Sequence, residues 1–267
     1  MADDHIKEFY RSHADKITDK RVKSPYPLRK YVHDMQYQSI LGFVEPGMRV
    51  LDAGCGEGSL SILMAQKGAT VVGCDISEPN IEACQRYAKE AGLTIEFLVA
   101  DLEHLPFPDA SFDLVVSSHV LEHLPDFDAG LAELMRVTKK RTVAAIPTIL
   151  NLCSLVQVGK GWFYLSGIRS FLALPFGFLR MVFAFVTGAE GVDERYEAED
   201  VPHVFRFPWI LHKKARRLGF SVVAQEASSV CLPYFSAFLP LVKGLDAHRS
   251  TSLRNCGYGT TYVIEKA

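Results

Sequence analysis

The sequence predicts an α/β fold: a doubly wound, mostly parallel sheet of seven strands with a hydrophobic helical insertion. Short apolar runs alternate with longer helix-forming stretches through the first 147 residues. Such alternation is typical of a parallel sheet with helices on both faces. Two strand-like runs, SVVAQE and GTTYVIEK, resume the pattern late in the chain, after a long apolar stretch. These observations indicate one enlarged domain.

The elements are expected in a regular order. Residues 1–40 suggest helices interrupted at Pro25 and Pro27. Near the end, the segment PWILHKKARRLGF places Leu211, Ala215 and Leu218 on one helical face, with Gly219 as a stop. Strands are predicted near 49–53, 70–75, 94–99, 112–117 and 142–147. The chain therefore divides into an N-terminal helical part at 1–40, a core at 41–147, an insertion at 148–206 and a completion of the core at 207–267.

Composition narrows the class of protein. Of 267 residues, 48% are hydrophobic and 22% charged, enough for one substantial core. The net charge is −2 and no long Lys/Arg run occurs, so nucleic acid is not an expected partner. The six cysteines form no CxxC pair, which favours a reduced cytoplasmic interior. The polar start, MADDHIKEFYRSHADK, does not resemble a secretory signal.

A glycine-rich turn follows the first predicted strand in the segment VLDAGCGEG, with Gly54, Gly56 and Gly58. Glycines allow a tight turn and a close approach of a ligand to the backbone, and the helix start offers free N–H groups. The Gly-x-Gly-x-Gly spacing differs from that of dinucleotide enzymes, and Asp52 stands before it. That carboxylate would repel a pyrophosphate and favour a cofactor that carries an ammonium and a sulfonium.

Two further carboxylates end apolar runs. Asp75 closes TVVGCD about 20 residues after the turn, where it can accept hydrogen bonds from both hydroxyls of a ribose. Asp101 closes TIEFLVAD and can accept a hydrogen bond from an adenine amino group. Together with the turn, they indicate a pocket for an adenosine-bearing cofactor.

Residues 45 to about 147 resemble class I S-adenosylmethionine-dependent methyltransferases, in the subgroup of small-molecule and quinone methyltransferases. The motifs that carry the resemblance are LDAGCGEG, GCDIS, VADLEHLPFPDASFDLVVSSHVLEHLPD and ELMRVTKKRTVAAIP. The resemblance implies a Rossmann-like methyltransferase fold whose last two strands are antiparallel, and S-adenosyl-L-methionine as the cofactor. The implied cofactor-binding residues are Tyr10, Asp52, Gly54, Cys55, Gly56, Gly58, Asp75, Ile76, Asp101, Leu102 and Ser118.

The resemblance also gives these residues roles. The glycine loop with Asp52 would hold the methionine part of the cofactor, and Asp75 the ribose diol. Ile76 would flank the adenine, whose edge Asp101 and the Leu102 amide would read. The segment FYRSHADKITDKRV resembles the lid of the subgroup, so Tyr10 and His13 would close over the cofactor; an exposed amphipathic helix is the alternative. Arg29, Lys30 and Tyr31 face either an acidic acceptor or solvent.

Three histidines are candidate catalytic residues. A sulfonium methyl group is already activated, so transfer needs mainly positioning in a dry site, and a base near neutral pKa helps a phenol or enol acceptor. His119 lies where relatives approach the methionine end of the cofactor. His123 either assists catalysis or anchors the loop. His203 either enters the site from the insertion or caps the next helix.

The same segment matches His-x-x-Glu-His, a zinc-peptidase pattern, at His119, Glu122 and His123. The match is taken as accidental, because the peptidase pattern requires a helix and this segment is a turn after a strand. Some quinone O-methyltransferases have Glu-x-x-Glu-His here and can hold a divalent cation. We predict no metal, with a divalent ion at Glu122 and His123 as the alternative.

The insertion at 148–206 contains GWFYLSGIRSFLALPFGFLRMVFAFVTG. Arg169, Pro175, Gly177 and Arg180 interrupt it, so we expect no membrane-spanning helix. It either packs as an ordinary cap or lies at a bilayer surface or lines a tunnel for a long-chain substrate, with the arginines at the rim. The second interpretation uses residues 160–186, including Trp162, Phe163 and Tyr164, together with the apolar segment at 231–242.

The sequence thus predicts a cytoplasmic S-adenosylmethionine-dependent methyltransferase, and one of the two interpretations of the insertion places it in peripheral contact with a membrane. The expected acceptor is a hydrophobic small molecule or lipid-like compound, with a prenylated quinone precursor as the specific candidate. Two alternatives share the same cofactor pocket. One is transfer of another group, such as the amino group, to a quinone; the other is a non-catalytic regulatory or assembly protein that binds the cofactor.

Overall fold

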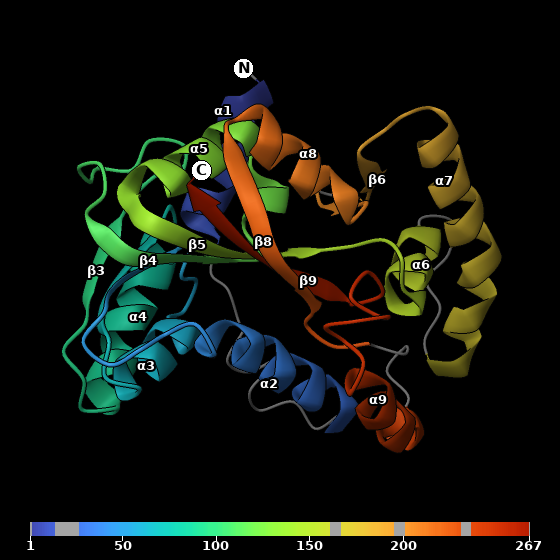
Figure 1. The fold of residues 1–267 in the computed structure, drawn as a ribbon, viewed down its shortest axis with the longest axis horizontal. Helices are drawn as coiled ribbons and strands as arrows, with labels where there is room; N and C mark the ends of the chain where they lie inside the picture. The colour runs from blue at the N-terminus through green and yellow to red at the C-terminus, as the bar shows by residue number, and fades with distance from the viewer. Residues whose placement is uncertain (1, 14–26, 161–166, 195–200, 231–235, 267) are drawn as a thin grey trace.

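The computed structural model describes residues 2–13, 27–160, 167–194, 201–230 and 236–266. A seven-stranded sheet in the order β3-β2-β1-β4-β5-β9-β8 organises the molecule (Figure 1). The first five strands pair in parallel, whereas β9 is antiparallel to both β5 and β8. The doubly wound, mostly parallel sheet predicted from the sequence is therefore confirmed. Its strands are β1 Arg49–Ala53, β2 Thr70–Asp75, β3 Glu96–Val99, β4 Phe112–Ser118, β5 Thr138–Pro147, β8 Phe220–Ala227 and β9 Gly259–Lys266.

Both faces of the sheet are buried. Successive residues of a strand point to opposite faces, and Val50 and Leu51 of β1 accordingly belong to two different hydrophobic clusters. On one face Leu51 packs with residues of α5 and α8, and on the other Val50 packs with residues of α2 and α3. The covering helices are α2 Pro27–Leu41, α3 Ser59–Gln66, α4 Glu78–Glu90, α5 Phe127–Val137 and α8 Trp209–Arg217.

Strand β5 begins earlier than predicted. The polar character of its first residues concealed its start in the sequence. It begins at Thr138, whereas the apolar run that predicted it begins near 142. Lys139 reaches Asp113 on the neighbouring β4, and Arg141 binds Glu265 on β9. Charged side chains at the solvent end of a strand pair with each other across the sheet, so no apolar alternation marks them in the sequence.

Parallel strands bring their carboxyl ends to one edge of the sheet. The loops after β1, β2, β3 and β4 therefore meet where the chain order reverses between β1 and β4. Such a switch point is the usual ligand site of an open parallel sheet. The glycine turn, Asp75, Asp101 and His119 all lie on these loops or at these strand ends.

The insertion between β5 and α8 contains α6 Leu152–Gly159, the 3₁₀ helix η4 Gly167–Ala173, α7 Leu174–Val186 and a two-stranded ribbon of β6 Gly191–Asp193 and β7 Val204–Arg206. The ribbon was not predicted, because three-residue strands are too short to show a periodicity. Helices α6 and α7 pack closely: a Cβ on Gly177 would lie 1.9 Å from the Leu155 carbonyl oxygen. Helix α7 forms the outer edge of the molecule (Figure 1).

The segment between the last two strands meets the insertion. It contains η5 Ser236–Phe238 and α9 Leu239–Asp246. Val242 of α9 packs with Cys153 of α6 and with Leu28 and Val32 of α2. Trp162, Phe163, Tyr164 and positions 231–235, which the sequence interpretation also used, lie outside the described residues, as does Pro25. Within the described ranges, no helix is long and apolar enough to cross a membrane.

Candidate active site

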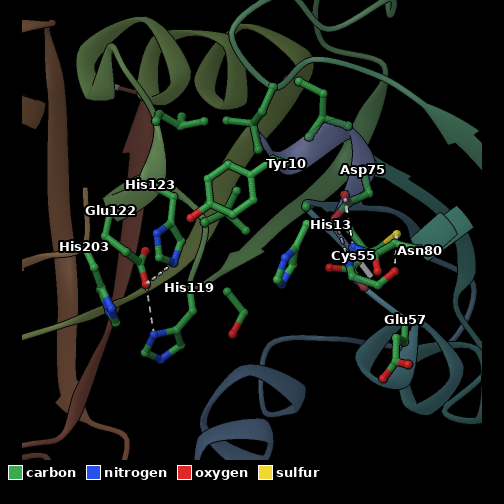
Figure 2. Close-up of a pocket in the computed structure, with 18 of the residues that line it drawn as sticks. Tyr10, His13, Cys55, Glu57, Asp75, Asn80, His119, Glu122, His123 and His203 are labelled. Carbon is green, nitrogen blue, oxygen red and sulfur yellow. Dashed lines mark hydrogen bonds and ion pairs between the residues drawn. The ribbon is translucent and has the colours of Figure 1, made fainter. Parts of the chain in front are cut away.

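A cavity of about 540 Å³ opens at the carboxyl ends of the strands, within the size range of small-molecule sites. Its wall includes each predicted cofactor-binding residue except Gly58, and also the three candidate histidines. Figure 2 shows Asp75 towards one end of this cavity and the histidines towards the other, with Tyr10 between them. The cavity therefore joins a carboxylate end to a histidine end.

The glycine turn has the backbone that only glycine adopts readily. Gly54, Gly56 and Gly58 have φ of 78°, 52° and 79°. A Cβ on Gly54 would lie 2.3 Å from the Val120 side chain. Gly58 caps the N-terminus of α3 and contacts Cys84 rather than the cavity. Gly54 and Gly56 therefore form the cavity wall, and Gly58 shapes the turn behind it.

Asp52 is a buried carboxylate beneath this turn. It accepts a hydrogen bond of 2.5 Å from the Ser61 hydroxyl. Burial, together with the nearby charge of Asp75, raises the pKa of Asp52 to about 6. A cationic ligand in the cavity would reverse this shift, because it favours the ionised carboxylate.

The carboxylate of Asp75 is held by the two loops that flank it. One oxygen accepts the Gly56 N–H at 2.9 Å, and the other accepts the Ser77 N–H at 2.9 Å. Asn80 also reaches the second oxygen, at 3.4 Å. These bonds fix the direction of the carboxylate at the cavity wall.

Asp101 lies at the end of the cavity near helix α1, Ala2–Ser12. The Lys7 ammonium is 2.6 Å from its Oδ2 and 2.6 Å from Glu103 Oε2. Burial opposes the charge of Asp101, but the hydrogen bonds from Lys7 and the Glu103 N–H outweigh it and lower the pKa. Lys7 was not predicted as a site residue, because a lone lysine on an N-terminal helix carries no signal of a contact so distant in the chain.

Helix α1 crosses the cavity. Lys7 and Tyr10 both line it, and the Tyr10 ring lies 5.4 Å from the ring of His123. Just past the helix, the His13 carbonyl oxygen accepts a hydrogen bond of 2.6 Å from the Ser77 hydroxyl. Tyr10 and His13 therefore lie where a covering segment would need them.

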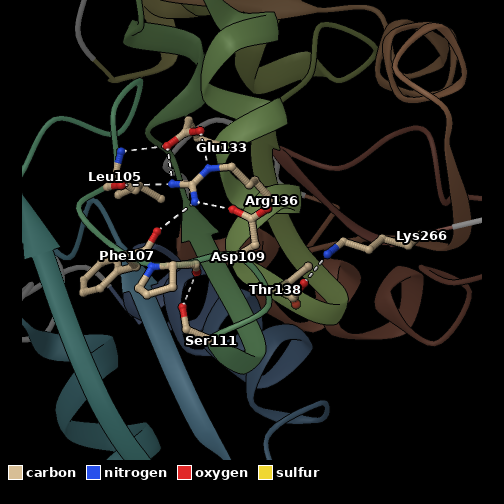
Figure 3. A network of polar contacts seen from close by, with 9 residues as sticks. Leu105, Phe107, Asp109, Ser111, Glu133, Arg136, Thr138 and Lys266 are labelled. Atoms are coloured by element: carbon tan, nitrogen blue, oxygen red, sulfur yellow. Dashed lines mark hydrogen bonds and ion pairs between the residues drawn. The ribbon is translucent and has the colours of Figure 1, made fainter.

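Arg136 of α5 holds the loop after β3 through several hydrogen bonds (Figure 3). Its guanidinium donates to Glu133, to the carbonyl oxygens of Leu105 and Phe107, and to Asp109. The bonds to Glu133 come first among the causes that raise the pKa of Arg136. Bidentate arginine pairs of this kind add geometric precision as well as energy. The loop that begins at Asp101 is thereby fixed to the core.

Glu122 organises the histidine end. Nδ1–H of His119 donates to its Oε1 at 3.1 Å, and Nε2 of His123 lies 4.0 Å from the same oxygen. Burial would raise the pKa of Glu122, but the hydrogen bond from His119 and the charges of the three histidines lower it to about 2. Oε2 of Glu122 is buried and has no hydrogen-bond partner among the described residues.

The three histidines have different surroundings. His119 has a left-handed backbone with φ of 58°, and its Nε2 is buried without a hydrogen-bond partner in the described part of the chain. His123 donates from Nδ1 to the Pro202 carbonyl oxygen at 3.1 Å, which leaves Nε2 as the acceptor nitrogen. The ring of His203 stacks on Phe205 and lies 4.9 Å from the ring of His123. The insertion therefore brings His203 into the site.

Glu122, His123 and His203 also form the kind of cluster that binds metals. One ligand atom from each lies within 4.8 Å of the others, and a carboxylate with imidazoles suits several divalent ions. Glu122 and His123 were the alternative ligands in the sequence, whereas His203, which is 80 residues further along the chain, was not among them.

Further polar side chains line the cavity. Gln157 of α6 and Tyr258 line it, as do Arg29 and Tyr37 of α2. Gln36 of the same helix donates to the Ser118 hydroxyl at 3.1 Å. Gln157 and Tyr37 were not predicted, because a helical pattern shows only which face is apolar, and Tyr258 was not predicted because it lies in a loop before β9.

The fold and the sequence motifs define a class of protein. Residues 51–146 match the family model described as a methyltransferase domain. The chain therefore carries a class I S-adenosylmethionine-dependent methyltransferase domain, and S-adenosylmethionine is the cofactor of this class.

Particular relatives share this domain. The chain is 34% identical over 129 residues to malonyl-[acyl-carrier protein] O-methyltransferase of Serratia marcescens, which covers 48% of this chain and 49% of that protein. It is 36% identical over 116 residues to ubiquinone biosynthesis O-methyltransferase of Chelativorans sp. (strain BNC1), which covers 42% of this chain and 46% of that protein. The chain thus matches about half the length of these relatives.

Solved structures share the fold over most of the chain. The PH0226 protein from Pyrococcus horikoshii OT3 superposes with a TM-score of 0.60 at 18% identity, covering 97% of this chain and 98% of that one. Magnesium protoporphyrin IX methyltransferase from Synechocystis PCC 6803 with bound SAM gives 0.53 at 19% identity, covering 99% of this chain and 90% of that one. At these identities the likeness establishes the fold.

The residues at the carboxylate end fit S-adenosylmethionine. Asp52, Asp75 and Asp101 are all hydrogen-bond acceptors, and this cofactor offers donors in its ammonium, ribose hydroxyls and adenine amino group. Burial raises the pKa of Asp52, and a ligand that carries an ammonium and a sulfonium would favour the ionised carboxylate. A dinucleotide would instead bring its pyrophosphate beside Asp52.

Proposed function

We propose that this protein methylates a hydrophobic small molecule or lipid-like acceptor, with a prenylated quinone precursor as the specific candidate. The observation that carries the proposal is the continuous cavity, which has three carboxylates at one end and three histidines around Glu122 at the other. A cofactor and an acceptor can thus meet in one enclosed space. The insertion that closes the histidine end is the part that a minimal methyltransferase lacks.

Different residues of the chain bind different parts of the cofactor. We assign the ribose hydroxyls to Asp75, the adenine edge to Asp101 and the Leu102 amide, and the positively charged methionine part to Asp52 and the glycine turn. When bound, S-adenosylmethionine supplies an activated methyl group on a sulfonium. Helix α1 covers the cavity and excludes water, which strengthens each electrostatic contact inside.

The histidine end accepts the proton that the acceptor loses. The low pKa of Glu122 keeps this carboxylate ionised at neutral pH, and an ionised carboxylate stabilises a neighbouring imidazolium. His119 is hydrogen-bonded to Glu122 directly. In His123 it is Nδ1 that contacts the Pro202 carbonyl oxygen, so Nε2 makes no bond to that carbonyl. Either ring, or His203 beside them, is therefore suited to the role of general base.

The choice of acceptor rests on the surroundings of the histidines and on the relatives. Gln157, Tyr258 and Arg29 offer hydrogen bonds to a polar reacting group. Relatives that share the domain are named O-methyltransferases, one acting in ubiquinone biosynthesis and one on a malonyl-[acyl-carrier protein]. An oxygen acceptor agrees with both observations.

The proposal is tested by incubating the protein with isotopically labelled S-adenosylmethionine and a membrane lipid extract, followed by mass spectrometry. We expect a lipid-soluble compound to gain one labelled methyl group. A product that gains nitrogen from the cofactor instead would indicate transfer of the amino group. Tight cofactor binding with no product from any extract would contradict catalysis and indicate a regulatory or assembly protein.

A further inference from the structure

Helix α7 exposes an apolar face to the outside of the molecule. Leu172 of η4, 63% exposed, extends this face beyond the start of α7. The residues of α7 that form it, with their exposed fractions, are Phe178 52%, Leu179 64%, Val182 39%, Phe183 71%, Phe185 62% and Val186 76%. We call these residues the α7 face. Large apolar side chains scattered singly on a surface are ordinary, but a contiguous group of this size indicates a contact surface.

The opposite side of α7 explains why these residues point outward. Gly177 and Ala184 are buried against the rest of the insertion, and the short distance from Gly177 to the Leu155 carbonyl leaves no room for a larger side chain. At 100° per residue, Leu179, Phe183 and Val186 form one stripe, and Phe178, Val182 and Phe185 a second beside it. The two stripes together cover about half of the helix circumference, which is wider than one packed neighbour requires.

The α7 face carries no charge. Arg180 is the one charged residue between Leu174 and Val186, and its guanidinium turns inward. It donates to Glu194 at 3.0 Å, to the Asp193 carbonyl oxygen at 2.7 Å and to the Val158 carbonyl oxygen. The expectation that Arg180 lies at a rim with its head towards phosphates or water is therefore wrong: it joins α7 to α6 and to the end of β6. Arg169, on η4, is exposed.

An aromatic group extends the face onto α8. Trp209 is 44% exposed, and its ring lies 6.2 Å from the ring of Phe185 and 4.9 Å from that of Phe207. Tryptophan is enriched where hydrocarbon meets water, because its ring is apolar and its N–H needs a polar partner. Trp209 begins α8, whose exposed residues Lys213, Arg216 and Arg217 are basic.

We infer that the α7 face docks onto a phospholipid bilayer. A fully buried phenylalanine removes roughly 150–250 Å² from water, so the three phenylalanines and four aliphatic residues present on the order of 700 Å². A protein interface makes about one hydrogen bond per 100–200 Å², yet the outward side chains of Leu174–Val186 contain no donor or acceptor. The hydrocarbon of a bilayer forms no hydrogen bonds, so it needs no donor or acceptor on the protein. A second copy of the chain is therefore the poorer occupant.

The position of α7 connects this surface to the cavity. Helix α6 separates them, with Gln157 on the cavity wall and Gly159 in contact with the start of α7. A bilayer under α7 would thus lie one helix away from the histidine end. Docking uses no residue of the cavity, so it can hold or fail independently of the proposed methyl transfer.

The test is flotation of the full-length protein with vesicles of phosphatidylcholine, with and without phosphatidylglycerol. We expect the unaltered protein to float. A variant with Phe178→Ser, Phe183→Ser and Val186→Ser should lose at least about tenfold in partitioning, because each buried apolar side chain contributes strongly to transfer from water. Equal flotation with both vesicle types assigns the binding to hydrocarbon, and a gain with phosphatidylglycerol adds a contribution from basic groups such as Arg169.

Two valines make a matched control. Val186→Ser removes apolar area from the α7 face, and Val223→Ser makes the same chemical change at a 53% exposed position on β8. We expect only the first to weaken flotation. All variants should keep their cofactor affinity, which shows that they are folded. Failure of the unaltered protein to float, or equal flotation of the triple variant, overturns the inference. So does a concentration-dependent dimer that the triple variant cannot form, in a protein that does not float.

Discussion

The Lys7 ammonium and the Asp101 carboxylate form a partly buried ion pair of 2.6 Å that ties helix α1 to the end of β3. Lys7 also contacts Glu103, which in turn accepts the Asp126 N–H. A single side chain thus links the covering helix to the loop proposed for the adenine. Closure of the cavity and occupation of that loop are expected to be coupled.

Replacement of Lys7 by Met should accelerate cofactor release. Charge-assisted hydrogen bonds contribute about 1.5–3 kcal/mol when shielded from water, and partial exposure reduces this value, so we expect the dissociation rate to rise about tenfold. Stopped-flow displacement of the bound cofactor measures it. Lys139→Met is the matched control, since it removes an exposed ion pair to Asp113 far from α1. Equal dissociation rates for the Lys7 variant and the unaltered protein would show that α1 does not retain the cofactor.

Cofactor binding should depend on pH through Asp52. Burial raises its pKa from 3.8 to about 6 in the free protein, so its contribution to stability is complete below pH 3.8 and is lost as the pH rises through 6. A cationic cofactor favours the ionised form, and affinity should therefore increase as the pH rises through about 6, with release of a proton. Calorimetry at pH 6 in two buffers of different ionisation enthalpy measures that proton. Asp52→Asn should abolish its release; release of the same proton by this variant would assign it elsewhere.

His119→Ala should lower kcat by about 100-fold or more and leave cofactor affinity nearly intact, if His119 assists proton removal. The reason is its bond to Glu122, which stabilises the protonated ring. Parallel variants at His123 and His203 identify the base among the three, since the largest loss of kcat should fall on the ring that takes the proton. Unchanged turnover in His119→Ala would leave this residue a structural role in the loop after β4.

A chelator should leave turnover unchanged. Oε1 of Glu122 already accepts a hydrogen bond from His119, so this oxygen does not need an ion as its partner. Turnover measured with and without EDTA tests this expectation. Loss of activity that a divalent ion restores would instead assign Glu122, His123 and His203 as ligands, in agreement with their mutual distances.

Local patterns were sufficient to predict most of the fold. Apolar runs such as TVVGCD become strands because residues on both faces are buried, and Leu211 and Ala215 are buried as the helical spacing predicts. The start of β5 and the β6–β7 ribbon were missed. At the start of β5, charged side chains pair across strands. In the ribbon, β6 and β7 have three residues each. Neither feature produces a periodic pattern of apolar residues in the sequence.

The site was predictable where its residues follow strands. Asp52, Asp75, Asp101 and the glycine turn belong to loops that a parallel sheet brings together, so their spacing was informative. Lys7 and Gln157 reach the cavity from elements at the two ends of the fold, and long-range packing alone places them. The direction of Arg180 was wrong for the same reason, because its partner Glu194 lies beyond the helix.

Calorimetric titration of S-adenosylmethionine and of its demethylated product tests the central claim most directly. Both should bind, and NAD should give no signal. Asp75→Ala should weaken binding by about 2–4 kcal/mol, roughly 30- to 1,000-fold in Kd, because it removes charge-assisted bonds to the ribose hydroxyls. Asp113→Ala, at an exposed carboxylate that Lys139 pairs, should bind as the unaltered protein does. Unchanged affinity in Asp75→Ala, or binding of NAD as strong as that of S-adenosylmethionine, would contradict the account.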